Sequence, residues 1–252
     1  PEGFINITAE YRDREDTNRT GFDPRRQYSQ SGPLDPREFT FDRRSHRFGD
    51  ARTEDVNIVV NMGTPISDSA NFYAFGTFGS RQGESAGFYR RAADNRNVLA
   101  IYPDGFLPLI SSDSTDRAIT AGFDGTFNDW NWDLSLGYGS NKVEFRVINS
   151  LNASLGAASP TEFDAGTLEH NQFLANFDAS RDLALSGVAR MTLAFGLEYR
   201  RERYKLGAGE PSSFVAGPVR VGENNSFITG AGATAFAAPG SQVFPGFQPS
   251  IG

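Results

Sequence analysis

Residues 119–139 read ITAGFDGTFNDWNWDLSLGYG, two alternating runs on either side of an Asn-Asp pair. Before the pair, Ile, Ala and Phe alternate with Thr, Gly and Asp; after it, Trp, Leu and Tyr alternate with Asn, Asp, Ser and Gly. A period of two is that of a β-strand with one apolar and one polar face. Asn and Asp favour a tight turn. The stretch therefore predicts an antiparallel hairpin whose second strand has Trp at one end of its apolar row and Tyr at the other.

The same alternation recurs along the chain and predicts about seven strands in all. The further strand segments are 4–12, 54–62, 71–81, 172–179 and 191–199. Polar segments without the period predict long loops, at 13–53, 82–115 and 148–167. From about Leu206 the chain reads as an irregular tail rich in Gly, Ser, Ala and Pro. Short turns are expected at 63–69, 128–129 and 181–190, so long and short connections alternate.

The apolar phase changes within the second strand of the hairpin. Residues 130–138 place apolar side chains at even numbers, whereas Val143, Phe145 and Val147 are odd-numbered. Such a change moves apolar side chains to the opposite face unless an extra residue intervenes. We therefore expect a bulge or a break beyond Gly139.

Composition excludes several classes of protein. The chain of 252 residues has a formal net charge of −7, whereas a general nucleic-acid binder usually carries a basic surplus. It has no cysteine, which excludes disulfides, thiolate metal sites and cysteine nucleophiles. No stretch approaches the roughly 18 apolar residues that a membrane-spanning helix needs. The chain begins at Pro1 without an initiator Met, and we expect it to be a piece of a longer protein.

The alternating connections favour a membrane barrel. If neighbouring strands pair antiparallel, all long loops lie on one rim and all short turns on the other, as in an outer-membrane barrel with long extracellular loops and short periplasmic turns. The longest alternating segments also exceed the roughly 5–6 residues usual for strands of a soluble sandwich. Seven strands cannot close a barrel of even strand number. We therefore predict an all-β fold in which residues 1–252 form part of the wall of a larger antiparallel transmembrane β-barrel, with about seven meandering strands.

Several short motifs, in this order, resemble the barrel part of TonB-dependent outer-membrane receptors. They are YPDGFLP at Tyr102 to Pro108, WNWDLS at Trp130 to Ser135, SPTEF at Ser159 to Phe163, FGLEYR at Phe195 to Arg200 and FPGF at Phe244 to Phe247. The resemblance implies a barrel of roughly 22 strands with a plugged lumen in the cell outer membrane. It also implies import of a small nutrient with energy delivered by TonB. The plug, the segment that contacts TonB and the terminal strands are not part of this sequence.

Two sets of loop residues are candidates for binding. Aromatic and cationic groups at the expected outer mouth could capture the nutrient, although they could equally pack the loop: Tyr89, Arg90, Arg91, Tyr102 and Phe106. Arginines of the first long loop could contact phosphates of lipopolysaccharide, or another anion, through paired hydrogen bonds: Arg37, Arg43, Arg44, Arg47 and Arg52. Interleaved Asp42 and Asp50 favour the alternative of an ordinary charged loop.

The sequence predicts neither an enzyme nor a cofactor or metal site. His46 and His170 lie in unrelated segments, and Asp113 with Asp116 does not complete a calcium-binding pattern. Two soluble alternatives remain open. A secreted β-sandwich binding module would fold in water without detergent. A β-rich glycoside hydrolase would need two carboxylates across a cleft, for which Asp178 and Glu198 could be nominated. The expected partners are outer-membrane lipid and lipopolysaccharide, TonB and an unidentified nutrient, with no nucleic acid.

Overall fold

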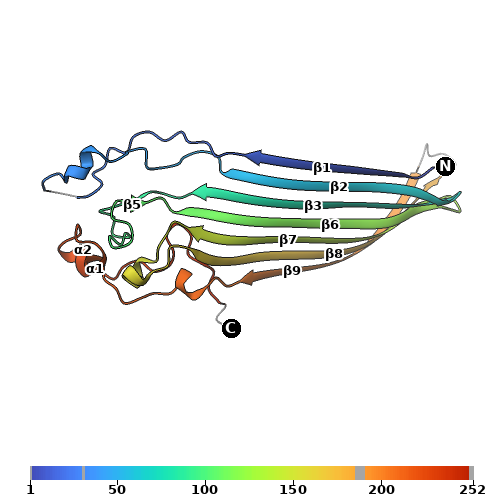
Figure 1. Ribbon diagram of the computed structural model, residues 1–252. Helices are drawn as coiled ribbons and strands as arrows, with labels where there is room; N and C mark the ends of the chain where they lie inside the picture. Colours follow the sequence, from blue (N-terminus) through green and yellow to red (C-terminus); the bar gives the residue numbers. More distant parts are fainter. Residues whose placement is uncertain (1, 30–31, 185–190, 250–252) are drawn as a thin grey trace.

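The computed structural model describes residues 2–29, 32–184 and 191–249, over which seven long strands form one antiparallel sheet (Figure 1). In sheet order the strands are β1 (Phe4–Arg14), β2 (Arg52–Ser67), β3 (Ala70–Ala86), β6 (Leu109–Phe127), β7 (Trp130–Ile148), β8 (Phe163–Leu183) and β9 (Met191–Gly207). Each strand pairs with the next one along this order. The all-β prediction and the seven-strand meander are confirmed.

The strands are longer than the alternation predicts. β6 begins at Leu109 instead of about 119, β8 begins at Phe163 instead of 172, and β3 continues to Ala86. The predicted loops at 82–115 and 148–167 therefore shrink to 87–108 and 149–162. Near these strand ends both faces carry polar side chains, as in the Ser-Ser-Asp-Ser-Thr run of β6, so the alternation disappears while the backbone ladder continues.

A register irregularity does lie beyond Gly139, but it follows the change of apolar phase on β7 instead of causing it. β6 and β7 pair in unbroken register from Leu109 opposite Ile148 to Phe127 opposite Trp130. A register shift between β7 and β8 occurs only at Phe145/Arg146. The phase changes because apolar residues near the loop end of β7 lie on the opposite face of the sheet, where the chain after β9 covers them. These residues form a cluster: Phe145, Val147, Phe163, Ala165, Val243 and Phe244.

The short turns are as tight as predicted or tighter. Asn128 and Asp129 connect β6 to β7 with φ angles of 48° and 65°, the left-handed conformation at both central residues that suits a two-residue hairpin. β2 and β3 extend until only Asp68 and Ser69 remain between them. The predicted turn at 181–190 starts later, because β8 continues to Leu183, and residues 185–190 lie outside the described part of the chain.

The long connections gather at one end of the sheet and the short turns at the other (Figure 1). They contain the short elements η1 (Pro36–Phe39), β4 (Arg90–Arg91), β5 (Gly105–Phe106), η2 (Ala153–Ala158), η3 (Pro211–Ser213), α1 (Val221–Asn224) and α2 (Ala231–Thr234). The tail after Leu206, expected to be irregular, packs against the second and third loops in an apolar cluster that includes Val98, Leu151 and Val221. None of the described helices has the length and apolar character needed to cross a membrane.

Candidate functional site

One face of the sheet is apolar from β1 to β9, and we call it the apolar face. The strand registers bring the alternating apolar residues to the same side. Its larger members are Ile5, Ile7, Tyr11, Val56, Ile58, Val60, Met62, Phe72, Phe78, Ile119, Phe123, Phe127, Trp130, Trp132, Leu134, Leu136, Tyr138, Phe173, Phe177, Leu193, Phe195, Leu197 and Tyr199. Many are open to solvent, with Leu197 72%, Ile7 66% and Ile119 57% exposed, so no second layer of described residues packs over them.

The apolar residues form a band across the sheet, and the limit of this band on the loop side runs obliquely to the strands. The last apolar residues before polar ones are Tyr11 (β1), Val56 (β2), Phe78 (β3), Ile119 (β6), Tyr138 (β7), Phe173 (β8) and Tyr199 (β9). Tyr11 pairs with Val56, so the limit is level on the first two strands. Compared with the residue that pairs with the limit of the previous strand, the limit lies two residues nearer the turns at β3 and again two residues nearer at β6. It stays level from β6 to β8 and lies two residues nearer the turns at β9. The limit therefore shifts by about one residue per strand.

Aromatic rings mark both limits of the band. On the turn side, the rings of Trp130 and Phe195 meet edge to face at 5.7 Å. They border a groove of about 520 Å³ that is also lined by Phe127, Trp132 and Phe177. On the loop side, Phe173 and Tyr199 meet edge to face at 6.3 Å. Rings at both limits are the arrangement expected where an apolar layer meets water on two sides.

The opposite face, which we call the polar face, carries charges that are paired across strands. Asp55 of β2 is almost fully buried. It is ion-paired with Arg12 of β1, at 2.8 Å, and with Arg81 of β3. Tyr73 of β3 donates its hydroxyl hydrogen to the carboxylate of Asp133 on β7, at 2.8 Å. These contacts link neighbouring and next-neighbouring strands through polar atoms, so this face suits contact with water or with a polar partner.

Nearer the turns, the polar face is acidic. Asp124 of β6 pairs with Asp133 of β7, which pairs with Asp178 of β8, so the three carboxylates lie side by side. Like charges directly opposite each other destabilise a sheet in the absence of a counter-charge. Asp178 and Glu198, the pair nominated for a glycoside hydrolase, both lie on this face on neighbouring strands.

The long loops are held together by buried Asn side chains. The Asn225 amide, in the tail, donates hydrogen bonds to the backbone carbonyls of Ala92, at 2.7 Å, and Asp94, at 2.9 Å, in the second loop. Asn152, in the third loop, donates to the carbonyls of Ser212 and Val215 in the tail, both at 2.9 Å. Both Asn residues are fully buried. Each bond satisfies a carbonyl that would otherwise lose its partner, so the loops form one folded assembly.

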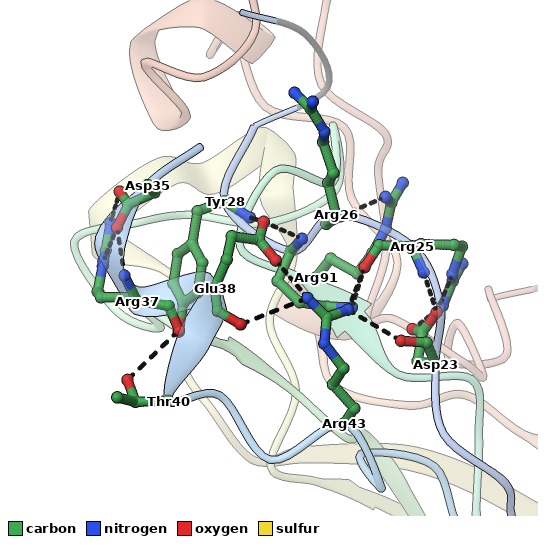
Figure 2. A network of polar contacts seen from close by, with 11 residues as sticks. Asp23, Arg25, Arg26, Tyr28, Asp35, Arg37, Glu38, Thr40, Arg43 and Arg91 are labelled. Carbon is green, nitrogen blue, oxygen red and sulfur yellow. Dashed lines mark hydrogen bonds and ion pairs between the residues drawn. The ribbon is translucent and has the colours of Figure 1, made fainter. Parts of the chain in front are cut away.

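The first long loop folds around the carboxylate of Glu38 (Figure 2). Glu38 accepts hydrogen bonds from the backbone N–H groups of Gln27, at 2.6 Å, and Tyr28, at 3.0 Å. Its other oxygen accepts from Arg43 at 2.8 Å. Arg43 also donates to the carbonyls of Asp23 and Arg25, at 3.0 and 2.8 Å. An ion pair between buried Glu38 and partly exposed Arg43 therefore closes a loop whose sequence is merely polar.

The aromatic and cationic candidates for ligand capture lie within the loop packing. Phe106 is 2% exposed and stacks on Tyr102, with ring centres 4.5 Å apart. Tyr89 donates to the carbonyl of Asp104 at 2.6 Å, and burial raises the pKa of its hydroxyl. Arg91 donates to the carbonyl of Arg26 at 2.7 Å. Arg90 is half-buried, and burial lowers the pKa of its guanidinium, with the neighbouring Arg96 acting in the same direction. Ligand contact by these residues stays a prediction.

The arginines predicted to contact phosphate already have neighbours within the protein. Arg37 is ion-paired with Asp35 at 2.9 Å and lies over the ring of Tyr28. Arg47 is ion-paired with Glu84 at 3.1 Å. Of the others, Arg43 is ion-paired with Glu38, Arg52 lies 3.9 Å from Glu15, and Arg44 lies over the ring of Phe22. These contacts favour a structural role in the first loop.

With this geometry established, comparison with known proteins adds no relative. No family model, curated protein or solved structure matches the chain.

Metal-binding geometry was not found among the described residues, where no group of three or more His, Asp or Glu side chains converges. His46 packs among the rings of Phe48, Phe88 and Tyr89 in the first and second loops, whereas His170 lies on β8. Asp113 and Asp116 are three residues apart on β6, so they point to opposite faces of the strand.

Proposed function

We propose that this chain is part of the wall of an outer-membrane β-barrel receptor of the TonB-dependent type, with its apolar face toward lipid and its polar face toward the lumen. The oblique apolar band is the observation that carries the membrane part of the proposal. The nutrient-import part rests on the sequence resemblance. In this arrangement the long loops lie outside the cell and the short turns face the periplasm.

The slope of the band has the value expected for tilted strands in a flat membrane. A shift of about one residue, or about 3.3 Å, per neighbouring strand at a spacing of about 4.8 Å corresponds to a tilt of about 35°. Strands of outer-membrane barrels tilt by about 35–45°. The border of a planar lipid layer would therefore cross successive tilted strands at residues shifted by about one position. The strand registers place the limit of the apolar band at such shifted residues.

The height of the band also supports this proposal. Trp130 to Tyr138 on β7 spans about 27 Å along the strand, which a tilt of about 35° reduces to about 22 Å along the membrane normal. The apolar band of outer-membrane barrels is about 25 Å high and is flanked by aromatic rings. The main alternative is a soluble sandwich, in which a second sheet would cover the apolar face. The exposure of Leu197 and Ile119 argues against such a second sheet among the described residues.

The open edges of the sheet support a larger assembly. β1 and β9 each pair on one side, and their residues are largely exposed. Long unpaired edges are prone to edge-to-edge association, and closing the barrel removes them. We propose that further strands pair with both edges. The acidic row of Asp124, Asp133 and Asp178 would then face the lumen, where a polar occupant can approach it.

The test is to isolate outer membranes from the source cells and probe the full protein with an antibody to this segment, on gels of boiled and unboiled samples. We expect an outer-membrane band that migrates faster unboiled, at a mass well above the 27.5 kDa of this chain. A soluble band near 27.5 kDa that is indifferent to boiling would overturn the barrel and favour the sandwich module. Uptake of the nutrient would then be assayed in cells with and without TonB.

A further inference from the structure

On the loop side of the apolar band, the first residue of this face is a cation on β6 and on β9, and a neutral polar residue on β7 and β8. Arg117 follows Ile119 on β6, and Arg201 follows Tyr199 on β9. Continuing toward the loops, Arg203 and Lys205 lie on the same face of β9. On β1 and β2 the corresponding positions, just beyond Tyr11 and Val56, are acidic: Asp13 and Glu54. Charge is therefore segregated along the border of the apolar band.

The strand register arranges the cations in rows, with neutral side chains between them in the first row and Glu169 between the lysines of the second. One row across β6 to β9 contains Arg117, Ser140, Asn171 and Arg203. The next row toward the loops contains Thr115, Lys142, Glu169 and Lys205. Arg201 lies one row below, opposite Phe173. The side-chain oxygen of Asn171 accepts the hydroxyl hydrogen of Tyr138 at 3.2 Å, which leaves the Asn171 amide hydrogens available as donors.

Arg201 and Arg203 differ from the arginines of the polar face. Both are exposed, and within the described residues no carboxylate lies at ion-pair distance from either. Arg200, the residue before Arg201 but on the polar face, is ion-paired with Glu198 at 3.0 Å. Two like charges two residues apart on one face of a strand repel each other, and a shared anion relieves that repulsion.

We propose that Arg201 and Arg203, assisted by Lys205 and Arg117, bind the phosphate of a lipid head group in the outer leaflet of the membrane. The proposal rests on the proposed function, because it needs the apolar face to lie in lipid. Arg117 and Arg201 are the first side chains beyond the band on β6 and β9, and Arg203 and Lys205 follow directly, so these cations lie at the depth of lipid head groups. Guanidinium groups match phosphate oxygens with paired hydrogen bonds. The acyl chains of the same lipid would then lie along Leu197 and Tyr199.

The experiment uses the full protein purified in a non-ionic detergent and titrated with three probes: bis-phosphorylated lipid A, the same lipid after removal of its phosphates, and inorganic phosphate. Retained lipid is measured by native mass spectrometry. The test variant is Arg201→Gln with Arg203→Gln. Its matched control is Arg14→Gln with Arg19→Gln, which changes charge equally at exposed positions away from these rows.

We expect the wild type and the control to retain phosphorylated lipid A, and the test variant to bind it at least about tenfold more weakly, because it lacks both guanidinium groups that pair with the phosphate. Equal retention by the test variant would overturn the proposal. Equal binding of the phosphate-free lipid would reduce the contact to the acyl chains, and full displacement by inorganic phosphate would assign the site to free phosphate instead; either result overturns it. Gel mobility of the unboiled sample separates the two proposals: if the fast band is present and lipid retention is unchanged, only the lipid site fails.

Discussion

Tyr73 on β3 reaches diagonally across β6 to Asp133 on β7, and its ring lies over Gly122, the residue of β6 directly opposite Tyr73. A β-carbon at Gly122 would lie 2.6 Å from the Tyr73 ring and 2.9 Å from the carbonyl oxygen of Leu134. Aromatic rings that cover glycines in this way fix the register of neighbouring strands. The glycine is therefore a structural requirement of the hydrogen bond.

Gly122→Ala is expected to displace the Tyr73 ring and lower the free energy of unfolding by about 1–3 kcal/mol, as overpacking does elsewhere. Gly139→Ala is the control, because nothing lies within 4 Å of a β-carbon there. The temperature at which the unboiled gel band loses its fast mobility measures the effect. Equal shifts for the two variants would contradict the role assigned to Gly122.

Ile119→Arg and Ala118→Arg test the two faces of the sheet with adjacent residues of β6. Ile119 lies on the apolar face and Ala118 on the polar face. An arginine facing lipid costs about 2–4 kcal/mol at mid-membrane and less near the border, whereas one facing a lumen costs little. Because Ile119 lies at the loop-side limit of the band, we expect Ile119→Arg to reduce folding into lipid vesicles modestly and Ala118→Arg to fold normally. The opposite order would mean that the lipid-facing side has been misassigned.

Glu38→Ala is expected to open the first long loop. Removing the carboxylate leaves Arg43 and the N–H groups of Gln27 and Tyr28 without their acceptor in a buried setting. Loss of one member of a fully buried ion pair costs about 3–5 kcal/mol, and the cost here is smaller because the Arg43 side chain is 29% exposed. Faster hydrogen exchange at the Gln27 and Tyr28 amides checks this prediction. Glu15→Ala serves as the control, because Glu15 is exposed and lies 3.9 Å from Arg52, and it should leave those rates unchanged.

The contacts of His46 should make the first loop sensitive to acid. Burial among Phe48, Phe88 and Tyr89 lowers the pKa of His46 below its usual value of about 6.5. The unfolded loop then binds a proton more readily than the folded one, so the stabilisation is complete above about pH 6.5 and decreases as pH falls toward the folded pKa. Nearby Asp23 opposes this shift and Arg25 reinforces it.

Limited proteolysis of the segment 15–51 at pH 7.5 and pH 5.5 measures this acid sensitivity. We expect the ratio of cleavage rates at the two pH values to be larger for the wild type than for His46→Gln, which cannot gain the proton. Identical ratios for the two proteins would remove His46 as the cause.

Asn225→Ala should separate the tail from the second loop. The Asn225 amide is fully buried and supplies both Ala92 and Asp94 with hydrogen bonds. Leaving these carbonyls unpaired costs about 1–3 kcal/mol each. Increased amide exchange around Ala92 is the expected readout. Asn95→Ala, at an exposed position of the same loop, should have no such effect; if both variants behave alike, the buried amide is not what joins the loops.

The strands of the sheet were predictable because their side chains report the environment of each face. The period of two in residues 119–139 gave a hairpin, and the structure contains it in the expected register. The loop-side extensions of β6 and β8 were not predictable, since polar side chains on both faces carry no period. Nor was the apolar phase change on β7 interpretable, because its cause, the cover provided by Phe244 in the tail, lies far away in sequence.

The loop contacts escaped prediction for a similar reason. Glu38, Asn152 and Asn225 are polar residues in polar segments, and only their burial distinguishes them. The arginine-rich first loop suggested anion binding, whereas acidic residues and aromatic rings inside the protein lie against most of those arginines. Arg201 and Arg203 lie instead on β9, in phase with the apolar residues of that strand, and the sequence could not show that they lack an ion-pair partner among the described residues.

The packing of the second loop against the tail affects how antibodies recognise the folded protein. The second loop and the tail, more than a hundred residues apart in sequence, present one joint surface because Asn225 and Asp94 are bonded together. An antibody raised against the folded protein would meet a discontinuous epitope drawn from several segments. A synthetic peptide copied from the second loop alone lacks the tail's amide that holds its backbone, so it would be a poor immunogen for the native protein.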